Sequence, residues 1–207
     1  MRTNDGKSTA NEGTLEILKR LGVLRTGHFR LTSGRHSDRY MQCAKLFEHP
    51  DESAELCGRL ADAFAEKLGA RGRRVDAVAG PALGGIIMAY ETARALGARG
   101  IFAERENGAM TLRRGFKVEP GERVLVVEDV VTTGGSVKEV IGLLQDMGAD
   151  VAGVGTMVDR SGGAVDFGVE FIPLLAVDIA SWDERDCELC RGGVPIVKPG
   201  SRDPSKG

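Results

Sequence analysis

Two adjacent carboxylates and the small polar loop after them have the clearest chemistry in the chain. Glu128 and Asp129 follow four aliphatic residues, 124–127, which predict a strand buried on both faces. The loop then runs through Val130, Val131, Thr132, Thr133, Gly134, Gly135 and Ser136. Its glycines allow close approach of backbone N–H groups, its hydroxyls donate hydrogen bonds, and the helix predicted next begins with unpaired N–H groups. These groups suit a phosphate, while ionised carboxylates suit ribose hydroxyls, so the segment predicts a site for a ribose 5-phosphate.

Two further loops also follow predicted strands. Residues 80–85 (GPALGG) come after the predicted strand 75–79, and residues 159–163 (DRSGG) after the predicted strand 151–158. Because the carboxyl ends of parallel strands meet at one edge of a sheet, we expect both loops to share a pocket with residues 128–136. The small residues of 80–85 favour close approach of a ligand to the backbone, although an ordinary strand-to-helix turn has the same composition.

The elements that must position these loops alternate between strand and helix patterns. Helices are predicted around Leu15–Leu21, from a cap at Asp51 or Ser53 to Gly69, and over 86–96 and 137–147; strands are predicted over 75–79, 100–103, 124–127 and 151–158, with a hairpin within 29–45. This rhythm predicts an α/β fold with a mostly parallel central sheet flanked by helices. We expect one domain over 14–200, with residues 14–45 as a small covering segment and flexible tails at 1–13 and 201–207.

Composition limits the classes of function. The chain has 207 residues, 42% of them hydrophobic and 28% charged, with a net charge of −2. This balance fits one folded domain and gives no general attraction to nucleic acid or acidic membranes. No apolar run approaches the ~20 residues of a membrane helix, and the N-terminus lacks the apolar stretch of a signal peptide. We therefore expect a cytoplasmic protein with small-molecule substrates.

The four cysteines, Cys43, Cys57, Cys187 and Cys190, allow two interpretations. Cys187 and Cys190 have the spacing of half a zinc site, but no second Cys or His pair stands at a matching spacing. The sequence alone therefore favours reduced thiols.

The strand, the acid pair and the Thr/Gly loop resemble the signature of the type I phosphoribosyltransferase family. Residues 27–34 (GHFRLTSG), 80–85 and 158–163 (VDRSGG) narrow the resemblance to the members of that family that use orotate, over roughly 14–200. The resemblance implies the fold of that family, with a small N-terminal hood. It also implies transfer of the phosphoribosyl group of phosphoribosyl pyrophosphate (PRPP) to orotate, giving orotidine 5′-monophosphate (OMP) and pyrophosphate. Mg²⁺ would be held mainly by substrate phosphates and ribose hydroxyls, and a homodimer is expected.

Site residues follow from the same resemblance. PRPP would contact residues 128–136 and also Ala82, Leu83, Gly84 and Arg105, while Glu128, Asp129 and Arg105 would take part in catalysis. Arg105 belongs to a polar stretch, 105–115, that in the family closes over pyrophosphate, often from the neighbouring subunit; a solvated hairpin is the simpler interpretation. Orotate would contact Thr132, Arg160, Tyr40 and Met41. The guanidinium of Arg160 suits the carboxylate of orotate, although a structural ion pair with Asp129 or Asp159 is the alternative.

The chain departs from the better-known branch of the family at three positions. That branch has lysines where Thr32, Gly84 and Glu106 stand here. Mg²⁺ and arginines such as Arg105, Arg113 and Arg114 would then supply the missing positive charge. Two other functions stay open: a phosphoribosyltransferase for another base, and a regulatory protein of the same fold that senses PRPP. Arg160 offers a partner for a carboxylate, which argues against a base that has none. The absence of a basic or DNA-binding segment argues against a regulatory protein.

Overall fold

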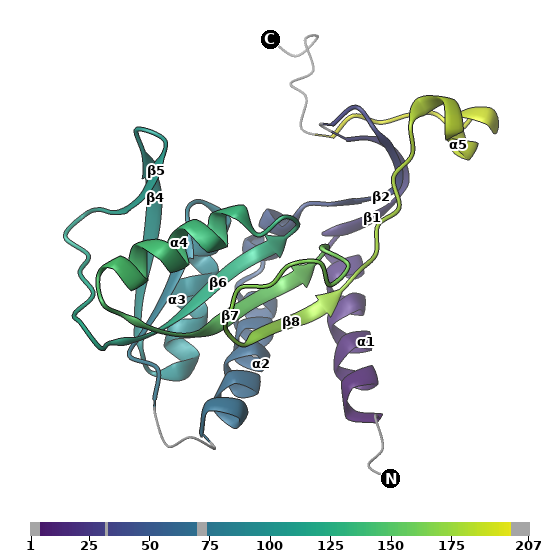
Figure 1. Ribbon diagram of the computed structural model, residues 1–207. Coiled ribbons are helices and arrows are strands. Elements are labelled where there is room, and N and C mark those ends of the chain that lie inside the picture. The colour runs from purple at the N-terminus through teal and green to yellow at the C-terminus, as the bar shows by residue number, and fades with distance from the viewer. Residues whose placement is uncertain (1–4, 32, 70–73, 200–207) are drawn as a thin grey trace.

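A six-stranded sheet forms the centre of the molecule, as seen in a computed structural model that describes residues 5–31, 33–69 and 74–199 (Figure 1). The strand order is β5-β4-β3-β6-β7-β8. The strands are β3 (Ala77–Pro81), β4 (Arg99–Glu106), β5 (Ala109–Leu112), β6 (Arg123–Val131), β7 (Asp150–Asp159) and β8 (Phe171–Ala176). All neighbours are parallel except β4 and β5, which form an antiparallel hairpin. The predicted α/β class with a mostly parallel sheet is confirmed.

Helices cover both faces of this sheet. Helix α4 (Gly135–Asp146) packs on one face, and α2 (Pro50–Gly69) and α3 (Gly84–Leu96) pack on the other. Side chains of β6 pack into the hydrophobic core on both faces of the sheet. Val124 and Val126 belong to the cluster under α4, and Leu125 and Val127 belong to the opposite cluster. This alternation confirms a strand buried on both faces. Two short elements of the sheet, β5 and β8, were not predicted.

The boundaries of α2 and β6 differ from the sequence-based expectation, whereas the end of α3 agrees with it. Helix α2 begins at Pro50, before both predicted caps, and the hydroxyl of Ser53 instead donates to the Leu46 carbonyl at 2.9 Å. Helix α3 ends as predicted at Gly97, whose φ of 64° places it in the left-handed region that suits glycine. Strand β6 continues past the acid pair, because Val130 and Val131 still pair with β7. The two carboxylates therefore lie inside the strand rather than at its exit.

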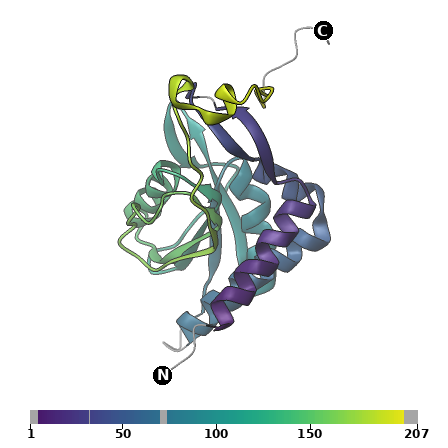
Figure 2. The same cartoon turned by 90° about the vertical axis from the view of Figure 1, so that its right-hand side faces the viewer.

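The N-terminal part lies beside the sheet and above the carboxyl ends of its strands (Figures 1 and 2). Helix α1 (Asp5–Arg20) leads into the antiparallel hairpin of β1 (Leu24–Arg30) and β2 (His36–Met41), and a 3₁₀ helix, η1 (Cys43–Glu48), returns the chain to α2. The hairpin is confirmed, and we call it the hood. Residues 5–13, expected in a flexible tail, belong to α1, so the helix begins earlier than predicted. Thr32, one of the three positions without a lysine, lies outside the described residues.

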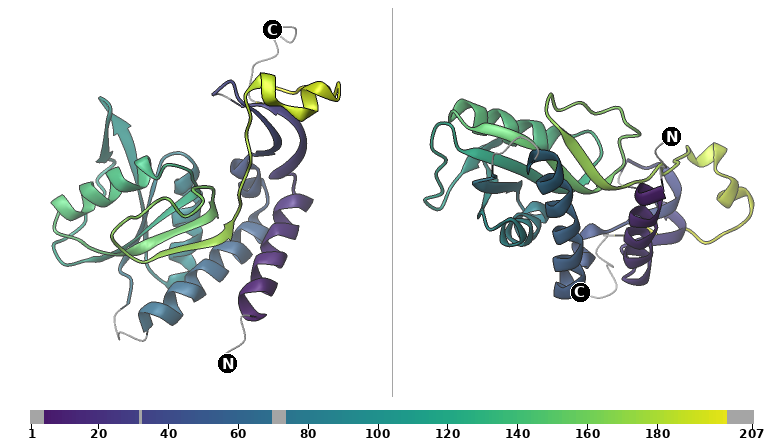
Figure 3. Two further views of the ribbon diagram at one scale, coloured as in Figure 1. Left: turned by 45° about the vertical axis from the view of Figure 1, so that its right-hand side comes forward. Right: turned by 90° about the horizontal axis from the view of Figure 1, so that it is seen from below.

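The chain after β8 crosses to the hood and runs along both of its strands, as the further views of Figure 3 show. His36 pairs with Trp182, and Phe29 pairs with Val197. Between these two pairs lie a 3₁₀ turn, η2 (Glu184–Asp186), and a single helical turn, α5 (Glu188–Arg191). We call residues 177–199 the strap. Among the described residues no helix has the length and apolar character needed to cross a membrane.

Candidate active site

A cavity of about 210 Å³ lies between the end of β6 and the start of α4, and we call it the cradle. It is lined by Glu128, Val130, Val131, Thr132, Thr133, Gly134, Gly135, Ser136 and Val137. Gly134 has a φ of 73°, and a Cβ there would lie 2.8 Å from the side chain of Val165. Only glycine therefore fits this turn. No side chain caps α4, so its first N–H groups remain available to an anion, as predicted for a phosphate loop.

The acid pair lies at the edge of the cradle. The N–H of Asp129 donates to Glu128 Oε1 at 3.2 Å, and the N–H of Val130 donates to Asp129 Oδ1 at 2.8 Å. Burial, followed by the charge of Asp129, raises the pKa of Glu128 to about 8. Burial also raises the pKa of Asp129. Full ionisation of both carboxylates is therefore unfavourable until a cation or hydroxyl donors approach them.

The loop of residues 80–85 packs directly against this pair. A Cβ added at Gly84 would lie 2.6 Å from the carboxyl group of Asp129, so a larger residue would displace that carboxylate. The N–H of Ala82 donates to the Ala103 carbonyl at 2.7 Å, and the side chain of Leu83 is exposed. The loop thus meets the acid pair, but none of its residues lines the cradle. The contact gives a steric reason for glycine where the better-known branch has lysine.

A second cavity, of about 250 Å³, lies between β7 and the hood. Its lining includes three of the four residues predicted for orotate, and its members are Arg160, Tyr40, Met41, Arg39, Arg30, Leu31, Ser33 and Pro199. The fourth, Thr132, lines the cradle instead. The N–H of Arg160 donates to the Val131 carbonyl at 2.8 Å, so a backbone hydrogen bond joins a lining residue of this cavity to a lining residue of the cradle. We call the second cavity the base pocket.

Among the described residues, no side-chain hydrogen bond or ion pair explains the position of the Arg160 side chain. Its buried Nε has no hydrogen-bond partner. Asp159, one of the alternative partners, instead accepts a hydrogen bond from the N–H of Ser161 at 2.8 Å. A buried, unsatisfied guanidinium nitrogen beside a cavity is costly unless a ligand completes it.

Sequence reasoning missed five residues of the base pocket: Arg30, Leu31, Ser33, Arg39 and Pro199. Arg30 and Arg39 belong to the hood, and Pro199 ends the strap. Surface arginines on a hairpin give no signal of their own in the sequence. Pro199 lies at the pocket only because Val197 pairs with Phe29.

Arg105 lies outside both cavities in this structure. It stands near the tip of the β4–β5 hairpin, where its guanidinium donates to the Gly108 carbonyl at 2.8 Å and pairs with Glu139 of α4 at 2.7 Å. Arg113 and Arg114 pair with Glu106 and Glu104 at 3.3 and 3.0 Å. The polar stretch is thus a hairpin with paired arginines, and contact of Arg105 with PRPP stays a prediction.

A third group of reactive side chains lies away from both cavities. Cys187 and Cys190 face His28 and His36 of the hood, a partner pair that is near in space although not at a matching spacing in the sequence. The sequence gives no sign of this pairing, because the Cys pair and the His pair are separated by about 150 residues, far beyond the spacing of local zinc motifs.

Comparison with known proteins agrees with this fold. Residues 51–167 match the phosphoribosyl transferase domain, and the chain therefore belongs to the phosphoribosyltransferase family. Its similarity within that family is specific. An orotate phosphoribosyltransferase of Pelotomaculum thermopropionicum is 59% identical over 186 residues, covering 90% of this chain and 95% of that protein. One of Thermotoga maritima is 57% identical over 187 residues, covering 90% and 97%. The chain thus belongs with the orotate phosphoribosyltransferases.

Solved structures lead to the same group. The crystal structure of orotate phosphoribosyltransferase from Aeropyrum pernix superposes with a TM-score of 0.63 at 28% identity, covering 78% of this chain and 92% of that one. The enzyme of Mycobacterium tuberculosis, in complex with inorganic phosphate, gives a TM-score of 0.62 at 28% identity, covering 81% and 96%.

Proposed function

We propose that the chain transfers the phosphoribosyl group of PRPP to orotate, forming OMP and pyrophosphate, with Mg²⁺. The observation that carries this proposal is the adjacency of two different cavities. One offers an anion loop with a carboxylate pair at its edge, and the other offers a guanidinium whose buried Nε has no hydrogen-bond partner among the described residues. A ribose phosphate and a planar carboxylic acid match these two sets of groups.

The base end rests on Arg160. Its buried Nε lacks a partner, and a planar carboxylate can accept two parallel hydrogen bonds from a guanidinium. Tyr40 and Met41 line the same cavity and would pack against the base. Uracil and the purines have no carboxylate to pair with Arg160, so orotate is favoured over these bases.

The sugar end rests on the cradle and the acid pair. The 5-phosphate would accept hydrogen bonds from the N–H groups at the start of α4 and from the hydroxyls of the loop. Glu128 and Asp129 would accept hydrogen bonds from the ribose hydroxyls. C1′ would pass through an oxocarbenium-like state while N1 of orotate approaches and pyrophosphate leaves, so catalysis depends mainly on positioning and on charge at the leaving group.

The acid pair also suits a divalent cation near the pyrophosphate. Two buried carboxylates with raised pKa values gain most when positive charge is brought close to them. Bound to the phosphates and ribose hydroxyls, Mg²⁺ supplies positive charge for the leaving group. Glu128 and Asp129 would orient the sugar beside it, and Gly84 leaves the space that Asp129 occupies.

Assembly, location and domain limits belong to the same proposal. A cytoplasmic homodimer fits the family, with the β4–β5 hairpin reaching toward a neighbouring active site. The hairpin projects from the sheet, which supports this geometry (Figure 1). Residues 14–200 would form the domain, with the hood mainly within 14–45.

Paired measurements on Arg160→Ala test the function. PRPP affinity, measured by calorimetry, should be nearly unchanged, while orotate consumption, followed by its ultraviolet absorbance, should fall at least tenfold. A bidentate pair in a partly dry pocket is worth ~1.4 kcal/mol or more, which corresponds to that factor. Arg94→Ala is the matched control, because Arg94 pairs with Glu91 at the other end of α3. Equal loss of PRPP binding, or wild-type turnover of uracil or adenine as fast as orotate, contradicts the proposal.

A further inference from the structure

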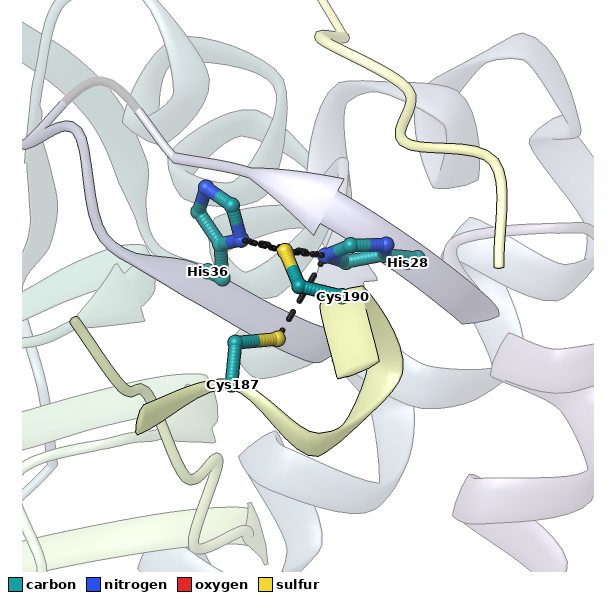
Figure 4. Close-up of side chains that lie close together, drawn as sticks. All are labelled: His28, His36, Cys187 and Cys190. Atoms are coloured by element: carbon teal, nitrogen blue, oxygen red, sulfur yellow. Dashed lines mark hydrogen bonds between the residues drawn. The ribbon is translucent and has the colours of Figure 1, made fainter. Parts of the chain in front are cut away.

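Four side chains from distant parts of the chain converge on one point between the hood and the strap. They are His28, His36, Cys187 and Cys190, which we call the Cys2His2 cluster. Figure 4 shows the two imidazoles pointing from the hood strands toward the two sulfurs on the turn at α5. One potential ligand atom from each lies within 4.8 Å of all the others.

The distances among these atoms match a tetrahedral zinc site. Zn–N bonds of about 2.0–2.1 Å and Zn–S bonds of about 2.3 Å place neighbouring ligands about 3.4 Å (N to N) and about 3.6 Å (N to S) apart. His28 Nε2 lies 3.1 Å from His36 Nδ1. The Sγ atoms of Cys187 and Cys190 lie 3.5 and 3.7 Å from His28 Nε2, and Cys190 Sγ lies 3.2 Å from His36 Nδ1.

One imidazole is already oriented as a ligand. His28 Nδ1 lies 2.8 Å from the Val194 carbonyl, an acceptor that fixes the proton on Nδ1. The lone pair of Nε2 then points toward the sulfurs. Zinc-bound histidines characteristically donate their second N–H to a carbonyl or carboxylate in this way. Here the carbonyl belongs to Val194 of the strap, so this hydrogen bond joins the hood to the strap, the same two segments that the four side chains bring together.

Apart from the cluster, the strap is held to the hood by hydrogen bonds rather than by an apolar core. Within residues 177–199, Cys187 is the only buried residue, and Val194, Ile196 and Val197 are all more than 40% exposed. Hydrophobic burial therefore contributes little to its attachment. In contrast, His28, His36 and Cys187 are at most 3% exposed. The most buried contact of the strap is thus a group of polar and sulfur ligands rather than an apolar core.

We propose that the Cys2His2 cluster binds one structural zinc ion that fastens the strap to the hood. All four positions are filled by protein, which leaves no open position for a substrate and makes the site structural rather than catalytic. Thiolate and imidazole ligands favour Zn²⁺ over Mg²⁺, which prefers oxygen, so this ion is distinct from the one proposed for catalysis. The site also bears on the base pocket, because Arg30 of the hood and Pro199 of the strap both line that cavity.

Zinc content tests the proposal directly. Protein expressed in zinc-containing medium and dialysed against metal-free buffer should retain one zinc per chain by plasma mass spectrometry. Cys190→Ser and His36→Ala should each lower that content at least tenfold. Cys57→Ala and His49→Ala are matched controls outside the cluster and should keep the metal.

Cobalt substitution covers the case in which a variant fails to fold. Wild-type protein loaded with Co²⁺ should show thiolate-to-cobalt charge-transfer absorption and the intense visible bands of tetrahedral coordination, and added Zn²⁺ should abolish both. Wild-type protein that neither retains zinc nor acquires these bands overturns the proposal. So does a Cys187–Cys190 disulfide in metal-free protein purified under reducing conditions, or unchanged zinc content in both cluster variants.

Discussion

Asp129 joins the two loops that would hold PRPP. Its carboxylate accepts the N–H of Val130 and occupies the space that a Cβ at residue 84 would take. The N–H of Val130 thus orients the carboxylate before any sugar arrives. A preorganised acceptor of this kind loses little entropy when the ligand binds.

Asp129→Asn should lower turnover at least tenfold. The substitution keeps the size of the side chain but removes the charge from hydrogen bonds to the ribose hydroxyls, and charge-assisted bonds are worth about 1.5–3 kcal/mol. Steady-state kinetics with both substrates saturating measures the effect. Asp146→Asn, at the far end of α4, is the control. Wild-type turnover in the Asp129 variant would exclude this residue from the active site.

Glu128→Gln should make the ligand-free protein more stable at alkaline pH. The pKa of Glu128 is about 8 in the folded protein, above the ordinary value of 4.5, mainly because of burial and then the charge of Asp129. Its contribution to stability is complete below about pH 4.5 and is lost as the pH rises through about 8. Glutamine does not ionise, so the variant escapes this loss.

Thermal melts of the ligand-free protein from pH 5 to pH 9 provide the measurement. The melting temperature of Glu128→Gln minus that of wild type should grow across this range, even though the variant is less active. Glu16→Gln, which changes an exposed carboxylate of α1, should give a difference with no such trend. If the melting temperatures of wild type and Glu128→Gln change with pH in parallel, ionisation of Glu128 does not destabilise the folded protein.

Elements with strong apolar periodicity could be predicted from the sequence. The stripe of Leu56, Leu60, Phe64 and Leu68 defined α2, and the four aliphatic residues before the acid pair defined β6. β8 was missed because Pro173 interrupts its pattern; as an edge strand paired only with β7, it tolerates a residue without an N–H donor. The end of β6 was missed because pairing with β7, not composition, extends it to Val131.

The candidate site was predictable where its residues follow one another in sequence. Every lining residue of the cradle except Val137 lies within the segment 128–136 that was predicted to bind the ribose phosphate. The base pocket and the Cys2His2 cluster instead depend on the path of the strap over the hood, which pairs Trp182 with His36 and Val197 with Phe29. Such long-range pairing leaves no periodic signal in a single sequence, so Arg39, Pro199 and the histidine ligands could not be assigned.

Arg105 of the β4–β5 hairpin pairs with Glu139, and this ion pair would have to break before the hairpin could close over a substrate. Arg105→Ala should lower turnover more than it weakens orotate binding, because Arg105 is proposed to reach the phosphates only after closure. Glu139→Gln removes its present partner while keeping the arginine, and should leave turnover at or above the wild-type value. Equal losses in both variants would mean that the ion pair only positions the hairpin. Collapse of orotate affinity in Arg105→Ala would place the residue at the base instead.

At the scale of the whole molecule, the candidate active site lies between two parts that are held together differently. The cradle belongs to the sheet, whose central strands are buried on both faces. The base pocket is closed by the hood and the end of the strap, and the strap buries little apolar surface. Regions with few buried contacts open locally at lower free-energy cost than a core, so the base side should be the more mobile half of the site.

Hydrogen exchange with single ligands should separate these halves. PRPP alone should protect amides of residues 128–137, which line the cradle. OMP carries both a ribose phosphate and the orotate carboxylate, so it should also protect β1, β2 and residues 182–197, because Arg160 and the hood would then contact one ligand. With Arg160→Ala, OMP should still protect the cradle but no longer slow exchange in the hood. If PRPP alone protects the hood as much as OMP does, the cradle and the hood already move as one body, and contact with the base does not couple them.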